Sequence, residues 1–162
     1  MRHAKAEPFA ASDHERTLTD RGLASARDAG THLREWGVVP DYAVVSSAVR
    51  TRQTWDAVVE AAGWADCPVS FDDAVFTGSA DVVIEALRAA PEDARTVVFV
   101  GHNPTAAFLC HHLDDGQGDP DRVSELFKGF PPGAVALLDV HVPWAELDAA
   151  RASVTGFYVG RG

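Results

Sequence analysis

Four residues at three places in the sequence carry side chains suited to binding and attacking an oxyanion. Arg2 and His3 are adjacent at the start of the chain, Arg50 lies in the stretch SSAVRTRQT, and His102 lies in GHNP. A guanidinium fork matches the oxygens of a phosphate group, and an imidazole can donate a hydrogen bond or attack phosphorus to form a phosphoryl-imidazole. Brought together, these residues would form a pocket for phosphoryl transfer, in which the arginines stabilise charge on the equatorial oxygens.

The elements expected around these residues alternate between strand and helix. The apolar spacing predicts a helix that begins near Leu18, is capped by Thr19 and stops at Gly37. The next elements are a strand at 42–47, a helix at 50–63, a short extended segment at 69–71 and a helix at 80–90 capped by Ser79. A strand at 95–100 follows, and then a helix with Asn103 as its cap and Pro104 at its first position. The last elements are a loop at 114–121, a short helix at 122–127, and strands at 133–140 and 153–159 that are joined by a brief helical turn near Trp144. This alternation predicts an α/β domain with a mostly parallel sheet covered by helices.

The position of the charged residues relative to the expected strands indicates where a ligand would bind. In parallel α/β sheets the ligand site lies beyond the carboxyl ends of the strands. Arg50 follows the strand at 42–47, and His102 follows the strand at 95–100. If these strands are neighbours, we expect both residues to converge with Arg2 and His3 on one pocket.

Length and composition bound the possible classes of protein. A chain of 162 residues with 46% hydrophobic and 23% charged residues is typical of one globular domain, here 1–162. A net charge of −10 argues against nucleic-acid or membrane-surface partners, although residues 1–54 hold eight Lys and Arg against seven Asp and Glu. The sequence shows no membrane span and no signal-peptide core, so we expect a cytoplasmic protein with Cys67 and Cys110 as reduced thiols.

Five stretches, RHAKA, ERTLTDRG, SSAVRTRQT, FVGHNP and FPPGAVALLDV, resemble in order and spacing the histidine phosphatase superfamily, branch 1, and especially its small SixA-like phosphohistidine phosphatases. The resemblance implies a three-layer α/β/α fold like that of phosphoglycerate mutases. It implies that His3 is the nucleophile that becomes phosphorylated and that Arg2 and Arg50 clamp the phosphoryl group. His102 would donate to a phosphoryl oxygen, and no metal or other cofactor would be needed, because the arginines supply the positive charge.

The chain departs from the family pattern at its start. A hydrophobic strand, central to the sheet, normally leads into the RH motif, whereas only Met1 precedes it here. The expectation we favour is a natural chain that starts upstream of Met1. The alternative is a truncated fold without the first strand, which would expose two rows of backbone hydrogen-bonding groups and leave a slot in the core.

A second departure concerns the general acid. Phosphoglycerate mutases carry a glutamate soon after the RH motif, whereas Ala4 and Lys5 stand here. Asp13 is our candidate for a proton donor or substrate orienter, and the alternative is that it pairs with Arg16 or caps its loop. Arg16 would line the pocket or brace the loop, and Lys5 would add positive potential at the pocket mouth. The lack of an obvious acid favours a phosphohistidine substrate, since a protonated imidazole leaves with a pKa near ~6.5, far below that of an alkoxide.

The function expected from these residues is a metal-independent phosphatase acting on a phosphohistidine in a protein, for example a two-component phosphotransfer domain. One alternative is a broad-specificity phosphomonoesterase for small phosphorylated metabolites. Another is a non-catalytic phosphate-binding regulatory module. Such modules usually lose a reacting residue, however, and all four of the residues above are present.

Overall fold

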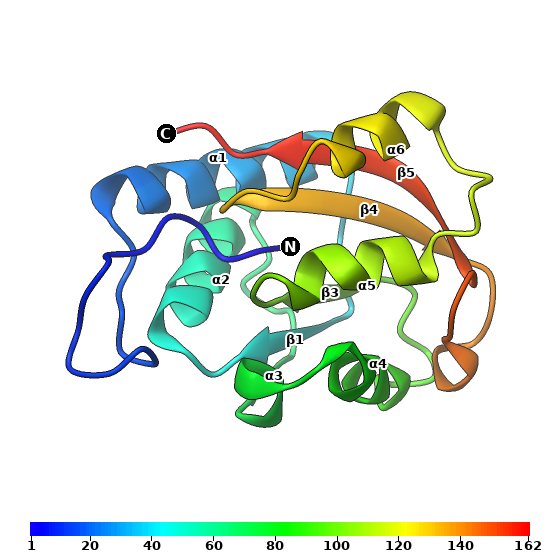
Figure 1. The fold of residues 1–162 in the computed structure, drawn as a ribbon, viewed down its shortest axis with the longest axis horizontal. Helices are drawn as coiled ribbons and strands as arrows, with labels where there is room; N and C mark the ends of the chain where they lie inside the picture. Colours follow the sequence, from blue (N-terminus) through cyan, green and yellow to red (C-terminus); the bar gives the residue numbers. More distant parts are fainter.

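The computed structural model describes residues 1–162 and has the expected alternation of strands and helices (Figure 1). The elements, in chain order, are α1 (Asp20–Glu35), β1 (Tyr42–Ser46), α2 (Val49–Ala62), β2 (Val69–Asp72), α3 (Ala74–Thr77), α4 (Ala80–Arg88), β3 (Val97–Val100), α5 (Thr105–Leu113), α6 (Pro120–Phe127), β4 (Ala134–Val140), the 3₁₀ turn η1 (Trp144–Glu146) and β5 (Ala152–Val159). None of the helices has the length and apolar character that crossing a membrane requires.

Local sequence signals explain where the two longest helices begin and end. Thr19 caps α1, and its hydroxyl accepts a hydrogen bond from the amide of Gly22 at 3.0 Å. Gly63 ends α2 in the left-handed region at φ 79°, where a residue with a Cβ is disfavoured. These boundaries confirm the predictions for α1 and α2 to within about two residues.

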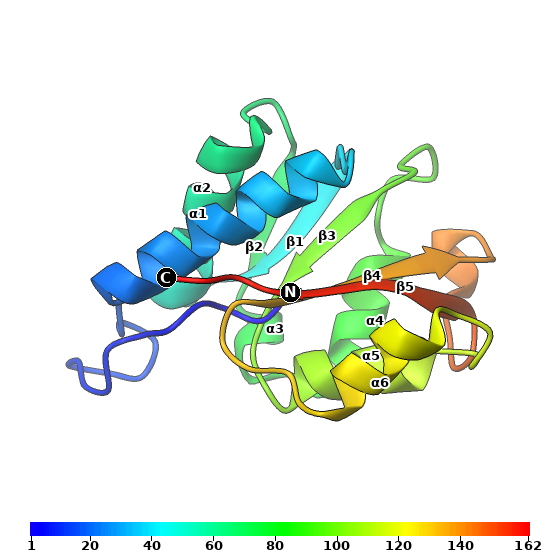
Figure 2. The ribbon, with the colours of Figure 1, turned by 90° about the horizontal axis from the view of Figure 1, so that it is seen from above.

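The strands form two separate sheets. β1 lies between β2 and β3 and pairs in parallel with both, whereas β4 and β5 form an antiparallel pair. Figure 2 shows α1 and α2 on one side of the parallel sheet and α3, α4 and α5 on the other. One apolar core lies under α1 and α2 and another under α4 and α5. The three layers and the parallel sheet confirm the predicted α/β fold class.

The chain start joins the two sheets. The Met1 ammonium donates to the carbonyl of Phe99 at 2.8 Å, and the His3 amide donates to that of Gly101 at 2.9 Å. On the other side, the Arg2 amide donates to the carbonyl of Ala134 at 2.9 Å. Residues 1–3 therefore occupy a strand position between β3 and β4, at the carboxyl end of β3.

A slot continues from Met1 between the two sheets. A cavity of about 150 Å³ runs beside Met1, and all 18 residues that line it are hydrophobic, among them Val97 and Phe99 of β3 and Leu138 and Val140 of β4. Because β3 and β4 do not pair with each other, this apolar slot is bounded by two strand edges.

The caps of two later helices differ from the prediction, and one short helix was not predicted. Helix α5 begins at Thr105, so Pro104 is its N-cap and Asn103 lies outside it; the Asn103 amide donates to the carbonyl of Phe130 at 2.8 Å. Ser79 stands at the N-cap of α4, but its side chain makes no capping hydrogen bond. The single-turn helix α3 was not predicted. It follows a turn in which the Asp72 carboxylate accepts from the amide of Ala74 at 2.7 Å, and four residues are too few to show helical periodicity.

Candidate active site

The three places with candidate residues meet at the carboxyl edge of the parallel sheet. β1 and β3 are neighbours with Val45 opposite Val100, so the turns that follow the two strands lie side by side. The rings of His3 and His102 are 5.2 Å apart between centroids, and Arg50 lies within hydrogen-bond distance of His102. The predicted convergence of these residues is therefore present in the fold.

Hydroxyl side chains on α2 fix the backbone around the site. The hydroxyl of Thr51 donates to the carbonyl of Ser46 at 2.8 Å and so holds the turn between β1 and α2. The hydroxyl of Thr54 accepts from the amide of Ala4 at 3.0 Å and donates to the carbonyl of Arg50 at 2.7 Å. The polar residues of SSAVRTRQT thus tie the chain start to the helix that carries Arg50.

His3 has the tautomer and the charge state of a nucleophile. Its Nδ1 atom lies 2.7 Å from the carbonyl of Ala4, which can only accept, so Nδ1 carries the proton and Nε2 keeps its lone pair. The residue is only 9% exposed, and burial lowers the pKa of His3 to about 4, with the charges of Arg50 and Arg2 acting in the same direction. The imidazole is therefore neutral at physiological pH.

The two arginines retain unused hydrogen-bond donors. Arg50, 5% exposed, donates to the main-chain carbonyl of Asp13 at 2.5 Å and to its carboxylate at 3.0 Å, and Arg2 donates to the carbonyl of Phe130 at 3.0 Å. Three buried side-chain polar atoms have no partner, namely the Nε atoms of Arg2 and Arg50 and Oδ1 of Asn103. Buried donors without partners are rare and costly, and these two belong to the residues expected to clamp a phosphoryl group.

His102 is held on both of its nitrogen atoms. Arg50 lies 3.2 Å from Nδ1, and because a guanidinium can only donate, Nδ1 is the acceptor. The proton is therefore on Nε2, which lies 2.7 Å from the hydroxyl of the fully buried Ser46. Burial, together with the charge of Arg50, lowers the pKa of His102 to about 3. The predicted donation to a phosphoryl oxygen would need a proton on Nδ1, which neutral His102 does not carry in this arrangement.

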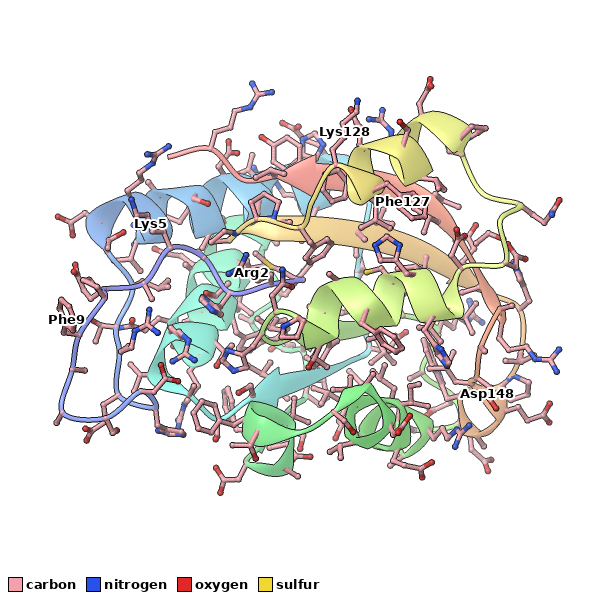
Figure 3. All side chains as sticks on the ribbon, in the orientation of Figure 1. Arg2, Lys5, Phe9, Phe127, Lys128 and Asp148 are labelled. Carbon is pink, nitrogen blue, oxygen red and sulfur yellow. The ribbon has the colours of Figure 1, made fainter.

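Asp13 and Arg16 brace the loop that precedes α1. The carboxylate of Asp13 pairs with Arg16 at 2.8 Å and with Arg50 at 3.0 Å, and Arg16 also donates to the carbonyl of Glu7 at 2.7 Å. The hydrogen bond from Arg16, followed by that from Arg50, holds the pKa of Asp13 below its usual value. Asp13 is thus an ionised acceptor. Lys5 is exposed, and its ammonium makes no hydrogen bond or ion pair (Figure 3).

Three residues that line or support the site are not among the candidate site residues predicted from the sequence. Phe76 of α3 contacts the ring of His102 edge-on at 5.5 Å and lies 5.8 Å from the guanidinium carbon of Arg50. His14 packs edge-on against Phe76 at 4.9 Å, and Ser46 anchors His102. The side chains of Phe76 and His14 reach the site through tertiary packing and lie in none of the five quoted stretches, whereas Ser46 is the first residue of SSAVRTRQT.

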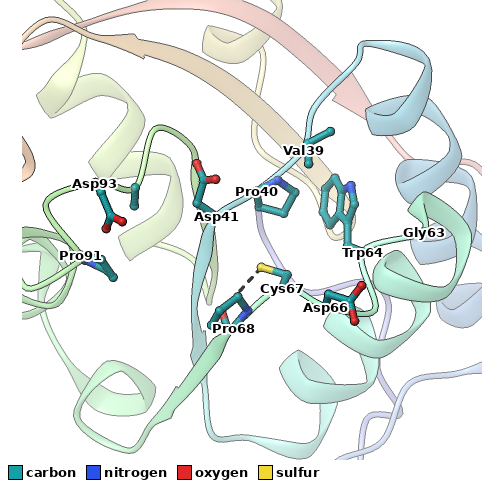
Figure 4. Close-up of a pocket in the computed structure, with 11 residues that line it drawn as sticks. Val39, Pro40, Asp41, Gly63, Trp64, Asp66, Cys67, Pro68, Pro91 and Asp93 are labelled. Carbon is teal, nitrogen blue, oxygen red and sulfur yellow. Dashed lines mark hydrogen bonds between the residues drawn. The ribbon is translucent and has the colours of Figure 1, made fainter.

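The opposite edge of the sheet has a cavity without comparable chemistry. Figure 4 shows this cavity, of about 580 Å³, between Asp41, Trp64 and Cys67. The Asp41 carboxylate is satisfied by two backbone amides, the Trp64 indole donates to a carbonyl, and burial raises the pKa of the Cys67 thiol. Both cysteines are free, and no group of three or more His, Cys, Asp or Glu side chains is arranged to hold a metal ion.

Comparison with known proteins places the chain in a family. The family described as the histidine phosphatase superfamily, branch 1, matches residues 1–75. An uncharacterized protein of Mycobacterium tuberculosis is 33% identical over 163 residues, covering 99% of this chain and all of the relative. A structure from Nakamurella multipartitia, described as a putative phosphohistidine phosphatase SixA, is 34% identical and superposes with a TM-score of 0.86 over 99% of this chain and 93% of that one. A SixA structure from Agrobacterium tumefaciens, described in the same way, is 27% identical, with a TM-score of 0.80 over 98% and 94%.

The fold and the paired histidines and arginines define a phosphatase of the phosphoglycerate mutase-like fold. The chain belongs to the histidine phosphatase superfamily, branch 1, and within it is SixA-like.

Proposed function

We propose that this enzyme hydrolyses phosphohistidine in a partner protein through a phosphorylated His3. The observation that supports the proposal is the arrangement of His3, whose Nδ1 proton is fixed on Ala4, whose ring is neutral, and whose ring centroid lies 5.2 Å from that of His102, the partner of Arg50. Both arginines have buried Nε donors without a protein partner, as required for binding an anionic group.

The first chemical step transfers the phosphoryl group from one imidazole to another. Nε2 of His3 attacks phosphorus, and the bond from phosphorus to the substrate nitrogen breaks in line with the attack. The substrate imidazole carries a proton on its other nitrogen, so it leaves as a neutral ring. His3, with its Nδ1 proton held by Ala4, becomes a phosphorylated imidazolium, and Arg2 and Arg50 stabilise the charge on the transferred oxygens.

The second step returns the enzyme to its starting state. Water attacks phosphorus, the bond from phosphorus to Nε2 of His3 breaks, and dihydrogen phosphate leaves while His3 retains its Nδ1 proton. Charge and protons balance in both steps without a metal ion or an external acid. His102, anchored through Nε2 on Ser46, presents Nδ1 to Arg50 and holds the guanidinium in place for the phosphoryl oxygens.

The state of Asp13 favours a phosphoramidate over a phosphate monoester. A monoester needs a proton donor for its alkoxide leaving group, whereas a protonated imidazole leaves readily. Asp13 is ionised by its two arginine partners, so it is a poor donor at neutral pH.

The test uses a histidine-phosphorylated phosphotransfer domain as substrate. We expect phosphate release and, after rapid quenching, acid-labile phosphate on the enzyme. The His3→Ala variant should form no phosphoenzyme and lose at least about a thousandfold in rate, whereas His111→Ala, on the exposed face of α5, serves as the matched control. A higher kcat/KM on small phosphomonoesters than on phosphohistidine would support the broad phosphomonoesterase, and phosphate binding without turnover would support a binding module.

A further inference from the structure

A third cavity, next to Arg2 at the chain start, carries a concentration of positive charge. It measures about 870 Å³ and lies between the chain start, α6 and the end of β5. Its cationic lining residues are Arg2, Arg122, Lys128 and Arg161. Glu125 is the only carboxylate among the lining residues, in a chain whose net charge is −10. This cavity is called the basic cavity below.

Most of this positive charge is not neutralised within the protein. Arg122 pairs with Glu125 at 2.9 Å, but Arg2, Lys128 and Arg161 form no ion pair. Figure 3 shows Lys128 just beyond the last turn of α6, and both Lys128 and Arg2 line the basic cavity. Cations of one sign on a cavity wall raise the local concentration of anionic partners.

The wall of the basic cavity is fixed by packing. The ring of Tyr158 stacks on His32 at 3.7 Å, and its hydroxyl donates to Asp28 at 2.6 Å. The guanidinium carbon of Arg161 lies 6.0 Å from the Tyr158 ring. An extended peptide that enters the basic cavity would therefore meet separated cations on a preformed surface.

We infer that the basic cavity binds an acidic segment of the phosphorylated partner protein while the phosphohistidine of that partner reaches His3. This inference rests on the proposed function. Arg2 lines the basic cavity and is one of the two arginines proposed to clamp the phosphoryl group, so an occupant of the basic cavity would lie next to the reacting group. Cations spread over α6 and the end of β5 match several carboxylates along a chain better than a single compact anion.

The test reverses the charge of two lining residues that take no part in the chemistry. The Lys128→Glu, Arg161→Glu double variant is compared with the wild type and with Arg151→Glu, an exposed cation outside the basic cavity. Each enzyme is assayed on a histidine-phosphorylated phosphotransfer domain and on free phosphohistidine. Binding of a fluorescent hexaglutamate peptide is measured by anisotropy at low and moderate salt.

For the double variant we expect KM on the phosphorylated domain to rise at least about tenfold, with kcat/KM on free phosphohistidine unchanged. We expect peptide binding to be salt-sensitive in the wild type and in Arg151→Glu and lost in the double variant. Equal kinetic constants for wild type and double variant on the domain would overturn the docking inference while leaving the proposed function in place. Failure of the wild type on both phosphohistidine substrates would instead refute the proposed function, and the peptide measurement would then decide the docking inference by itself.

Discussion

Arg50 donates a hydrogen bond to Nδ1 of His102 across 3.2 Å, and this contact determines the tautomer of the histidine. The proton that Nδ1 lacks is on Nε2, where the hydroxyl of Ser46 accepts it at 2.7 Å. Ser46 is therefore a positioning residue: it orients His102 and leaves Nδ1 directed at the guanidinium that is to bind the phosphoryl group.

Replacing Ser46 with alanine leaves the Nε2 proton of His102 without its partner in a buried site. We expect kcat to fall by up to about a hundredfold. The fall should be accompanied by a shift in the pH dependence of kcat, because loss of the hydrogen bond at Nε2 changes the pKa of His102. Ser46→Thr, which retains a hydroxyl, should restore part of the activity, and the control Ser47→Ala removes a hydroxyl bonded to His14 instead. Unchanged kcat and pH profile in Ser46→Ala would show that the contact has no role in positioning.

The charge state of His3 can be measured directly. Burial lowers the pKa of His3 to about 4, so the ring should titrate far below the usual value of about 6.5. NMR of the enzyme labelled at the histidine Cε1 positions should show the His3 resonance constant above about pH 5 and shifting only as the pH approaches 4. His3→Gln assigns the resonance. A midpoint near that of a free imidazole would contradict the neutral, buried nucleophile.

The same pKa values make the stability of the fold depend on pH. His3 and His102 have folded-state pKa values of about 4 and about 3, lower than in the unfolded chain, so the unfolded state binds more protons below about pH 6.5. The free energy of unfolding should therefore decrease as the pH falls from 6.5 toward 4. For each histidine the full decrease is about 1.4 kcal/mol for every unit by which its folded-state pKa lies below its unfolded-state pKa.

Urea unfolding at several pH values in this range would measure the decrease. His3→Gln, which removes one titrating ring, should show a smaller decrease than the wild type. An equal decrease in both proteins would mean that His3 does not contribute to it.

Asp13 offers a test that separates orientation from proton donation. Asp13→Asn removes the negative charge that holds Arg50 and Arg16 in place. We expect kcat/KM to fall by about tenfold or less, and to fall equally for phosphohistidine and for phenyl phosphates with good and poor leaving groups. A proton donor would instead show a loss that grows as the pKa of the leaving group rises. Such a graded loss would restore Asp13 as the general acid.

The sequence predicted the site better than its surroundings, for a physical reason. Arg50 follows β1, His102 follows β3, and Arg2 lies in the strand position beside β3. Parallel pairing brings the ends of neighbouring strands together whatever the details of side-chain packing. Phe76 and the tautomer-setting contact of Ser46 depend on how a one-turn helix and a buried hydroxyl pack in three dimensions. Asn103 was misassigned as a helix cap because the competing partner of its amide, the carbonyl of Phe130, is 27 residues away.

The apolar slot beside Met1 gives the last prediction, which concerns stability. The Met1 ammonium is buried between the two sheets, and burial lowers its pKa. A variant extended before Met1 by about five β-branched apolar residues, the usual length of a strand, should fill the slot, pair with the edges of β3 and β4, and replace a buried ammonium with an amide.

We expect this extension to raise Tm by about 5 °C or more, since 1 kcal/mol corresponds to roughly 2–4 °C in a chain of this size. An extension of equal length made of Gly and Ser is the control, because it removes the terminal charge from the same place without supplying apolar side chains. Calorimetry of the three proteins separates the two contributions. Equal Tm values for the apolar and the Gly-Ser extensions would mean that the slot does not accept a strand. A higher Tm for the apolar extension alone would assign the gain to burial of its side chains between β3 and β4.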